Sequence, residues 1–451
     1  MLKELLKPDI EELINLRLWT DLRDVFELWP PPEIAEFLLD IKKYERVLLF
    51  RALGRELSSD VFSYLEYEQR DELLKELTDQ ETREILEDLS PDDRTSLLEE
   101  LPAKVTLRLL NLLSNEDLKE ARYLLGYPED SVGRRMTPDF VAIKEDWTIK
   151  QALEHIRKFG IDSETIYRIY IVDNGGKLID DILLRNIILC DENDNVAKLM
   201  DFNVVALSAF DDQEKAVNVM EKYDLSALPV VDSKGLLVGI ITFDDVFDIY
   251  KEESTEDIHK LGGVNPVYQS YVSSSALKLY TKRIPWLLGL LCASFVSATL
   301  IKHYDPVNQA FLILASFIPM LIGSAGNTGT QSSTLIIRAL STNDLDSDDW
   351  LLVVKKEFFL GSLLAATLSS IVFLGGMILG DDSFVIAKVV AISMFAMIIW
   401  ANLLGSLLPI FLAKLKLDPA VISNPLISTI LDSTGIIIYY NVAVSILNIN
   451  F

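Results

Sequence analysis

The fold is decided by the stretch NPLISTILDSTGIII, residues 424–438. It lies in a region, 419–451, whose one charged residue is Asp432. This region is apolar and long enough to cross a bilayer, which takes roughly 20 residues. A carboxylate in the middle of a span costs roughly 2.5–3.5 kcal/mol on insertion scales, so intramembrane acids usually serve a function. Asp432 therefore predicts a cation site on a pathway; an acid buried between helices and bonded to a nearby Ser or Thr is the alternative.

Working outward, the apolar runs before this stretch predict an all-α membrane domain over 284–451 with five helices. We expect them near 284–304, 311–340, 357–380, 384–413 and 421–447. Pro319 and the glycines after it should break the second span. Glu357 opens the third span and should lie at the membrane interface.

Basic residues between the spans predict the orientation, because cytoplasmic loops are enriched in Lys and Arg. Such residues fall between spans two and three (Arg338, Lys355, Lys356) and between spans four and five (Lys414, Lys416). We therefore expect residues 1–283 in the cytoplasm and Phe451 outside, in a multi-pass protein of the cell (inner) membrane.

Charge and apolarity occupy different halves of the chain. The 451 residues carry a formal net charge of -26, and the acids crowd residues 1–260. Such a surface repels nucleic acid and anionic lipid and attracts cations. The two cysteines and three scattered histidines form no disulfide framework or zinc pattern. The charged N-terminal segment predicts no cleaved signal peptide.

The charged half divides into a helical part and a repeat. Residues 1–130 show leucines at helical spacing in short units of similar length, which predicts an all-α superhelical domain. The stretches IYIVDNGG at 169–176 and LPVVDSKG at 228–235 are copies of one strand-turn pattern. Aligning them pairs Asn186 with Asp245, so two α/β units are expected at 131–199 and 200–250.

This repeat resembles a tandem pair of CBS domains. In that family a Ser/Thr-x-x-Asp element can hold a nucleotide's ribose, and the second copy has it in TFDD at 242–245. Thr242 and Asp245 are thus candidates for binding a nucleotide such as ATP. The first copy has Leu183 and Asn186 at these places. A dimerisation module without ligand is the other interpretation.

Polar residues inside the apolar half suggest a passage. Span two contains PMLIGSAGNTGTQS at 319–332, whose polar groups cannot face lipid. They either form a packing seam of small residues or line water, with Asn327, Thr330 and Gln331 as pore-lining candidates. Asn424 and Asp432 are eight residues apart, so they share one helix face.

The candidate ligands are all oxygens, which selects Mg²⁺ or Ca²⁺ over zinc or copper. One carboxylate per chain is too few for an all-protein cage, but Mg²⁺ dehydrates reluctantly and keeps several waters. A hydrated Mg²⁺ held by Asp432 from each of two symmetric chains fits this inventory.

Several motifs together resemble the MgtE family of magnesium channels and transporters: YPEDSVG at 127–133, TEDIHKLG at 255–262, RIPWL at 283–287, GNTGTQS at 326–332, DPA at 418–420 and NPL at 424–426. Thr330 stands where relatives commonly have Asn. The resemblance implies a homodimeric Mg²⁺-selective pore that cytosolic Mg²⁺ closes, with 251–283 as a plug and connecting helix. It implies Asp432 in the pore and regulatory metal ligands at Asp92, Asp93, Asp212, Glu214, Asp224, Asp245, Asp248, Glu253, Glu256, Asp257 and Asp418.

Two other functions stay open: a membrane-anchored nucleotide or metal sensor that conducts nothing, and a coupled secondary transporter of divalent cations. We find no motif of an enzyme. The expected partners are a second copy of the chain and membrane lipid, with no nucleic acid and no obligatory protein partner.

Overall fold

The computed structural model describes residues 8, 10, 12–14, 16–65, 67–268, 271–272, 274–310, 312–342, 344–379, 383–421 and 424–448. The expected N-terminal segment lies partly outside these residues, and Phe451 lies wholly outside them. The chain divides into two compact units, Met1–Glu253 and Ser254–Phe451, which we describe one at a time.

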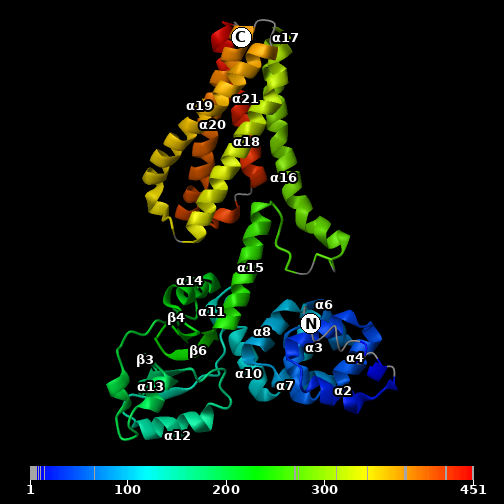
Figure 1. Cartoon of the computed structure of the whole chain (residues 1–451), viewed down its shortest axis with the longest axis vertical. Coiled ribbons are helices and arrows are strands. Elements are labelled where there is room, and N and C mark those ends of the chain that lie inside the picture. The colour runs from blue at the N-terminus through cyan, green and yellow to red at the C-terminus, as the bar shows by residue number, and fades with distance from the viewer. Residues whose placement is uncertain are drawn as a thin grey trace. The chain divides into compact units, whose positions relative to one another are not determined.

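The first part of unit one is a stack of short helices (Figure 1). They are α2 (Trp19–Phe26), α3 (Pro31–Asp40), α4 (Lys43–Ala52), α5 (Arg55–Ser63), α6 (Tyr67–Glu76), α7 (Asp79–Asp88), α8 (Pro91–Glu100), α9 (Ala103–Leu110) and α10 (Asn115–Leu124). Clear start signals account for the short lengths: prolines open α3 and α8, and Thr78 with Glu81 forms a capping box for α7. The predicted helical domain is confirmed.

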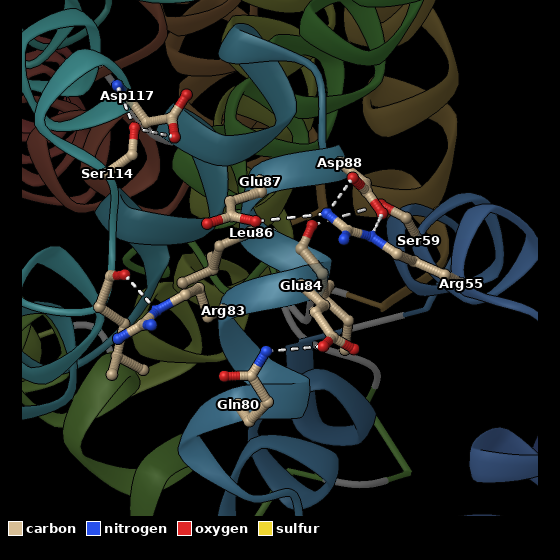
Figure 2. A network of polar contacts seen from close by, with 12 residues as sticks. Arg55, Ser59, Gln80, Arg83, Glu84, Leu86, Glu87, Asp88, Ser114 and Asp117 are labelled. Atoms are coloured by element: carbon tan, nitrogen blue, oxygen red, sulfur yellow. Dashed lines mark hydrogen bonds and ion pairs between the residues drawn. The ribbon is translucent and has the colours of Figure 1, made fainter.

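Leucine and isoleucine side chains form its continuous core, for example Leu73, Leu86 and Leu97. Polar contacts then join the helix ends. Figure 2 shows the guanidinium of Arg55, on α5, against Glu87 and Asp88 at the end of α7, with Nη2 2.7 Å from an Asp88 carboxylate oxygen. These groups are exposed, so water and salt weaken each pair, and burial of the apolar side chains stabilises the stack.

The second part of unit one contains two copies of one α/β pattern. Its elements are α11 (Val132–Arg135), β1 (Ala142–Lys144), α12 (Ile149–Phe159), β2 (Arg168–Val172), β3 (Leu178–Leu183), α13 (Leu184–Leu189), η1 (Val196–Leu199), β4 (Leu207–Ser208), α14 (Gln213–Tyr223), β5 (Ala227–Val231) and β6 (Leu237–Thr242). Each sheet has a parallel first pair and an antiparallel second pair, in the orders β1-β2-β3 and β4-β5-β6.

The two copies match residue by residue, as the sequence alignment predicts. Strand pairing is irregular at Val172 in one sheet and at Val231 in the other. Gly176 and Gly235 occupy equivalent turn positions with φ of 85° and 82°, a conformation that favours glycine. The two turns also bond each other, since Leu178 N donates to Gly235 O and Leu237 N to Gly176 O, both at 3.1 Å. The internal repeat is therefore confirmed.

A long helix, α15 (Phe243–Leu261), follows the last strand of the second copy. It carries two acids in its first turn and ends before Gly263, which has a φ of 68°. The helix therefore begins at Phe243, earlier than the expected plug segment 251–283, and residues 264–268 after it are not helical. Its residues from Ser254 onward belong to the second unit.

The second unit is a helix bundle of α16 (Ala276–His303), α17 (Asp305–Ala310), α18 (Leu312–Ser341), η2 (Ser347–Asp349), α19 (Trp350–Leu379), α20 (Ser383–Lys414), η3 (Pro419–Val421) and α21 (Asn424–Leu447). Five of its segments are long and apolar enough to cross a membrane, as expected. Helix α20 packs between α18 and α19, and α21 packs against α16, α18 and α20 (Figure 1).

Two expectations about these spans are wrong. Pro319 lies inside α18 without breaking it; the hydroxyl of Tyr439 donates to the backbone oxygen of Leu314 at 2.8 Å, so α21 braces this part of α18. Helix α19 begins at Trp350, one to two turns before the expected start. Glu357 is consequently inside the bundle and only 7% exposed, which the sequence did not predict; its expected place at the membrane interface stays a prediction.

Helices α18 and α20 cross with their backbones in contact. A Cβ atom added to Gly405 would overlap the backbone of Gly329, with its carbonyl carbon at 2.9 Å and its Cα at 3.0 Å. No side chain fits between them without moving one helix, so the glycine pair sets the distance between the helices.

We predict that Gly405→Ala destabilises the membrane domain by about 1–3 kcal/mol, the usual cost of overpacking. The matched control is Gly375→Ala on α19, where an added Cβ meets nothing within 4 Å. Thermal unfolding of the detergent-solubilised protein measures both. Equal midpoints for the two variants would contradict the proposed role of this contact.

Candidate functional site

Asp432 lies in the third turn of α21, and its side chain is half-buried. Among the residues that the structure describes, none forms a hydrogen bond or ion pair with it. The alternative from the sequence, an Asp bonded to a nearby Ser or Thr, is therefore not what the described part of the bundle shows. A lone carboxylate in an apolar bundle calls for a cation.

The contacts of the neighbouring residues explain why Asp432 has no partner among the described residues. Ser433 contacts Ser297 of α16, with hydroxyl oxygens 2.8 Å apart. Thr434 accepts from the indole nitrogen of Trp400, on α20, at 3.0 Å. Leu431 is buried and packs on Gly329 of α18. Three neighbouring helices thus use three directions around α21, and Asp432 occupies the remaining one.

Asn424 is the first residue of α21, two turns before Asp432. Its side-chain oxygen is enclosed and has no hydrogen-bond partner among the described residues. An enclosed amide oxygen without a donor is a suitable ligand for a cation or its water. The geometry thus keeps both candidates, Asn424 and Asp432, on one helix with unsatisfied oxygens.

Helix α18 has two unlike faces in the GNTGTQS segment. Asn327 and Gln331, one turn apart, are exposed and Thr330 is half-exposed. Gly329, between them, and Ser332, just after them, are buried against α20 and α21. One side of α18 is therefore a packing seam, and the exposed side carries the polar residues expected to line a pore, a role that stays a prediction.

The end of α15 meets the loop before α21. The ammonium of Lys260 bonds the carboxylate of Asp418 at 2.7 Å and that of Glu256, one turn back. Burial lowers the pKa of Lys260, but the two carboxylates raise it by more, so the pKa lies above its usual range. Burial and the nearby Asp418 raise the pKa of Asp257. A lysine therefore lies among three of the expected metal ligands, which the sequence analysis did not anticipate.

An acidic cluster forms within unit one. It consists of Asp92 and Asp93 at the start of α8 and Asp245 and Asp248 on α15, and these line a cavity of about 240 Å³ together with three basic residues, Arg70, Arg135 and Lys251. Burial, then the charge of Asp92, raise the pKa of Asp93 to about 6 and that of Asp245 well above its usual range. Carboxyls this crowded favour a bound proton or cation.

The other expected metal ligands lie apart from this cluster. Asp212 caps α14, where it accepts from the backbone nitrogen of Glu214 at 2.9 Å. Asp224 ends the same helix with a φ of 51°. Glu253 accepts from Gln213 at 2.6 Å. Within the described ranges, no three Asp, Glu, His or Cys side chains converge closely enough to hold a metal ion.

A second cavity, of about 680 Å³, lies beside the second α/β copy. It is lined by Glu164, Thr165, Tyr167, Arg168, Leu183, Asp224, Ser226, Thr242, Phe243 and Asp244. The hydroxyl of Thr242 contacts the carboxylates of Asp244 and Asp245, at 2.5 and 2.7 Å. Burial and the charges of Asp92 and Asp244 raise the pKa of Glu164 to about 7. Of the expected pair, Thr242 lines this cavity, whereas Asp245 lines the acidic cavity of about 240 Å³.

Sequence reasoning missed Lys260 and Glu357. The spacing of Glu256 and Lys260, four residues apart on a helix, already signals an ion pair, but the partner Asp418 is 158 residues away. Nothing in the sequence marks Glu357 as buried, because two exposed lysines precede it.

Family models match three parts of the chain. The MgtE intracellular N domain matches residues 29–130, the CBS domain matches 131–193 and 194–252, and the MgtE divalent cation transporter domain matches 318–442. Together they cover the helical stack, both α/β copies and most of the bundle.

Curated relatives and solved structures agree with these models. The chain is 42% identical to the magnesium transporter MgtE of Thermus thermophilus over 74% of each chain. It is 32% identical to that of Bacillus subtilis over 75% of this chain and 74% of the relative.

Among solved structures, the soluble part of a magnesium transporter is similar at 28% identity with a TM-score of 0.53, over 56% of this chain and 99% of the other. The cytosolic domain of the Mg²⁺ channel MgtE in complex with ATP has 37% identity and a TM-score of 0.49, over 50% and 93%. The chain belongs to the MgtE family of magnesium transporters and is a multi-pass membrane protein with a helical N domain and tandem CBS domains.

Proposed function

We propose that the chain forms a homodimeric, Mg²⁺-selective influx channel with Asp432 in its pore. The observation that carries the proposal is the half-exposed Asp432 carboxylate, which has no partner among the described residues. Two such carboxylates from symmetric chains can hold one hydrated Mg²⁺ without stripping its water. Asn424, Asn327, Thr330 and Gln331 supply further oxygens along the same passage.

The proposed gate uses the acidic residues outside the spans. Crowded carboxylates repel one another when cytosolic Mg²⁺ is low, and Mg²⁺ bridges them when it is high. The raised pKa values of Asp93, Asp245 and Asp257 support this, since burial first and neighbouring carboxylates second disfavour the charged form of each group. Mg²⁺ must bind the closed state more tightly than the open state for this to work. Residues before the first span face the cytoplasm in this scheme, and the C-terminus faces outside.

For the pore, we predict that Asp432→Ala and Asp432→Asn lower Mg²⁺ flux at least about tenfold, the effect of losing about 1.4 kcal/mol of ion stabilisation. Flux into liposomes, without a sodium or proton gradient, measures this and also separates a channel from a coupled transporter. Asp348→Asn, at an exposed position in η2, is the matched control. Wild-type flux in the Asp432 variants would contradict the assignment of Asp432 to the pore. Absence of flux in the native protein would favour a sensor that conducts nothing.

For the gate, we predict that neutralising Asp245, Glu256 and Asp257 together, as Asn, Gln and Asn, leaves the channel open at high Mg²⁺. The reason is that bridging ions lose their ligands. Electrical recording with Mg²⁺ varied on each side separately measures this. The control changes the same net charge at exposed Glu145, Asp146 and Glu221. Unaltered inhibition by Mg²⁺ in the first triple variant would rule out the scheme.

We also propose that the cavity beside Thr242 holds an adenine nucleotide. Its volume is adequate, and Thr242, Ser226 and the Phe243 ring offer polar and stacking contacts. Three acids line it (Glu164, Asp224 and Asp244) against one arginine, Arg168, which is already paired with Asp181. Phosphates there need an accompanying cation, so Mg²⁺-ATP is the expected form.

We predict that Thr242→Val weakens ATP binding about five- to tenfold, the effect of losing one hydrogen bond, and that Mg²⁺ strengthens binding in both proteins. Calorimetric titration measures this, with Ser208→Ala, outside the cavity, as control. Equal affinity in Thr242→Val would exclude the ribose contact, and absence of any binding would leave the CBS pair as a dimerisation module.

A further inference from the structure

Glu357 is a buried acid that the proposed pore does not use. It lies at the start of the third turn of α19, and only 7% of its surface is exposed. Within the described part of the chain no lysine, arginine or histidine pairs with it, and the adjacent Lys355 and Lys356 are exposed. Burying such a group in a membrane domain is costly unless hydrogen bonds satisfy it.

Two buried side chains from two other helices provide those bonds. The amide nitrogen of Asn402, on α20, donates to the Glu357 carboxyl at 2.7 Å and to the Glu357 backbone oxygen at 2.8 Å. The hydroxyl of Ser332, on α18, lies 3.2 Å from the same carboxyl oxygen and 3.1 Å from the Asn402 backbone oxygen. Glu357, Ser332 and Asn402 thus form a three-helix node joining α18, α19 and α20.

The three-helix node lies next to the exposed polar face of α18. Ser332 directly follows Gln331, and successive residues of a helix are turned by about 100°. One turn away, Gly329 of α18 and Gly405 of α20 are in backbone contact. The glycine contact sets the distance between the two helices, while the node sets the rotation of α18. A rotation by one residue would move Asn327 and Gln331 off their face and break both bonds to Ser332.

We propose that Glu357 is a positioning residue for cation permeation: its carboxyl fixes the rotation of α18 and thereby the direction of Asn327 and Gln331. The inference rests on the proposed pore function. What Glu357 contributes is a hydrogen-bond acceptor, so a neutral amide of the same shape performs the role.

The test measures Mg²⁺ flux and the Mg²⁺-to-Na⁺ permeability ratio of full-length variants in liposomes, per unit of assembled protein. Glu357→Ala lowers Mg²⁺ permeability about tenfold or more and lowers the permeability ratio, since a loosened site loses its geometry. Glu357→Gln retains both within about twofold. Gly376→Ala, whose added Cβ would overlap the Ala387 backbone between α19 and α20, controls for lost stability and leaves the ratio unchanged.

Each other outcome overturns the proposal. A wild-type ratio in Glu357→Ala removes the positioning role, and a loss in Glu357→Gln as large as in Glu357→Ala shows that the charge matters instead. Should Glu357→Ala not assemble, Ser332→Ala replaces it; this variant keeps the carboxyl bonded to Asn402, and an unchanged ratio overturns the proposal equally. Asp432→Ala, run in parallel, reports separately on the pore.

Discussion

Carboxylates held in buried or crowded surroundings are the constraint that recurs in both units. In unit one, Asp93 and Asp245 are crowded by Asp92, and the pKa of each is raised mainly by burial. In the bundle, Asp432 has no described partner. A protein that merely folds would pair or expose such groups. Their retention makes sense where a cation arrives from outside the chain, and the family to which the chain belongs transports one.

The bundle leaves Asp432 available because the residues next to it in sequence contact other helices. Ser433, Thr434 and Leu431 each contact a different helix. Close contacts at Gly329 and Gly405 then let α18 and α20 approach without side chains between them. Such packing costs flexibility, but it holds polar residues at fixed positions. A hydrated ion needs this, because it is recognised by the spacing of oxygens at some distance rather than by direct contact.

The sequence predicted the architecture well because its signals are local. Strand-turn repeats, helix caps and apolar runs each occupy a few consecutive residues, and the CBS copies even share the irregular pairing at Val172 and Val231. The sites were harder. Asp432 stood out through its isolation among apolar residues, whereas Glu357 followed two lysines and looked interfacial. Only packing against Asn402 and Ser332, 45 and 25 residues away, reveals its burial. Pro319 likewise lies inside an unbroken α18, which its local sequence did not predict.

Lys260 adds a consequence for the proposed gate. Its ammonium already bonds Glu256 and Asp418, so the chain carries its own cation at one proposed metal position. A divalent ion bridging these acids must compete with a tethered monovalent one. In the proposed gate, the free energy available for closing is the difference between binding Mg²⁺ and binding the lysine ammonium. This difference is smaller than the full binding free energy of Mg²⁺ for free carboxylates. A small difference suits a gate, because the channel can then open and close as the cytosolic Mg²⁺ concentration changes, instead of staying permanently closed.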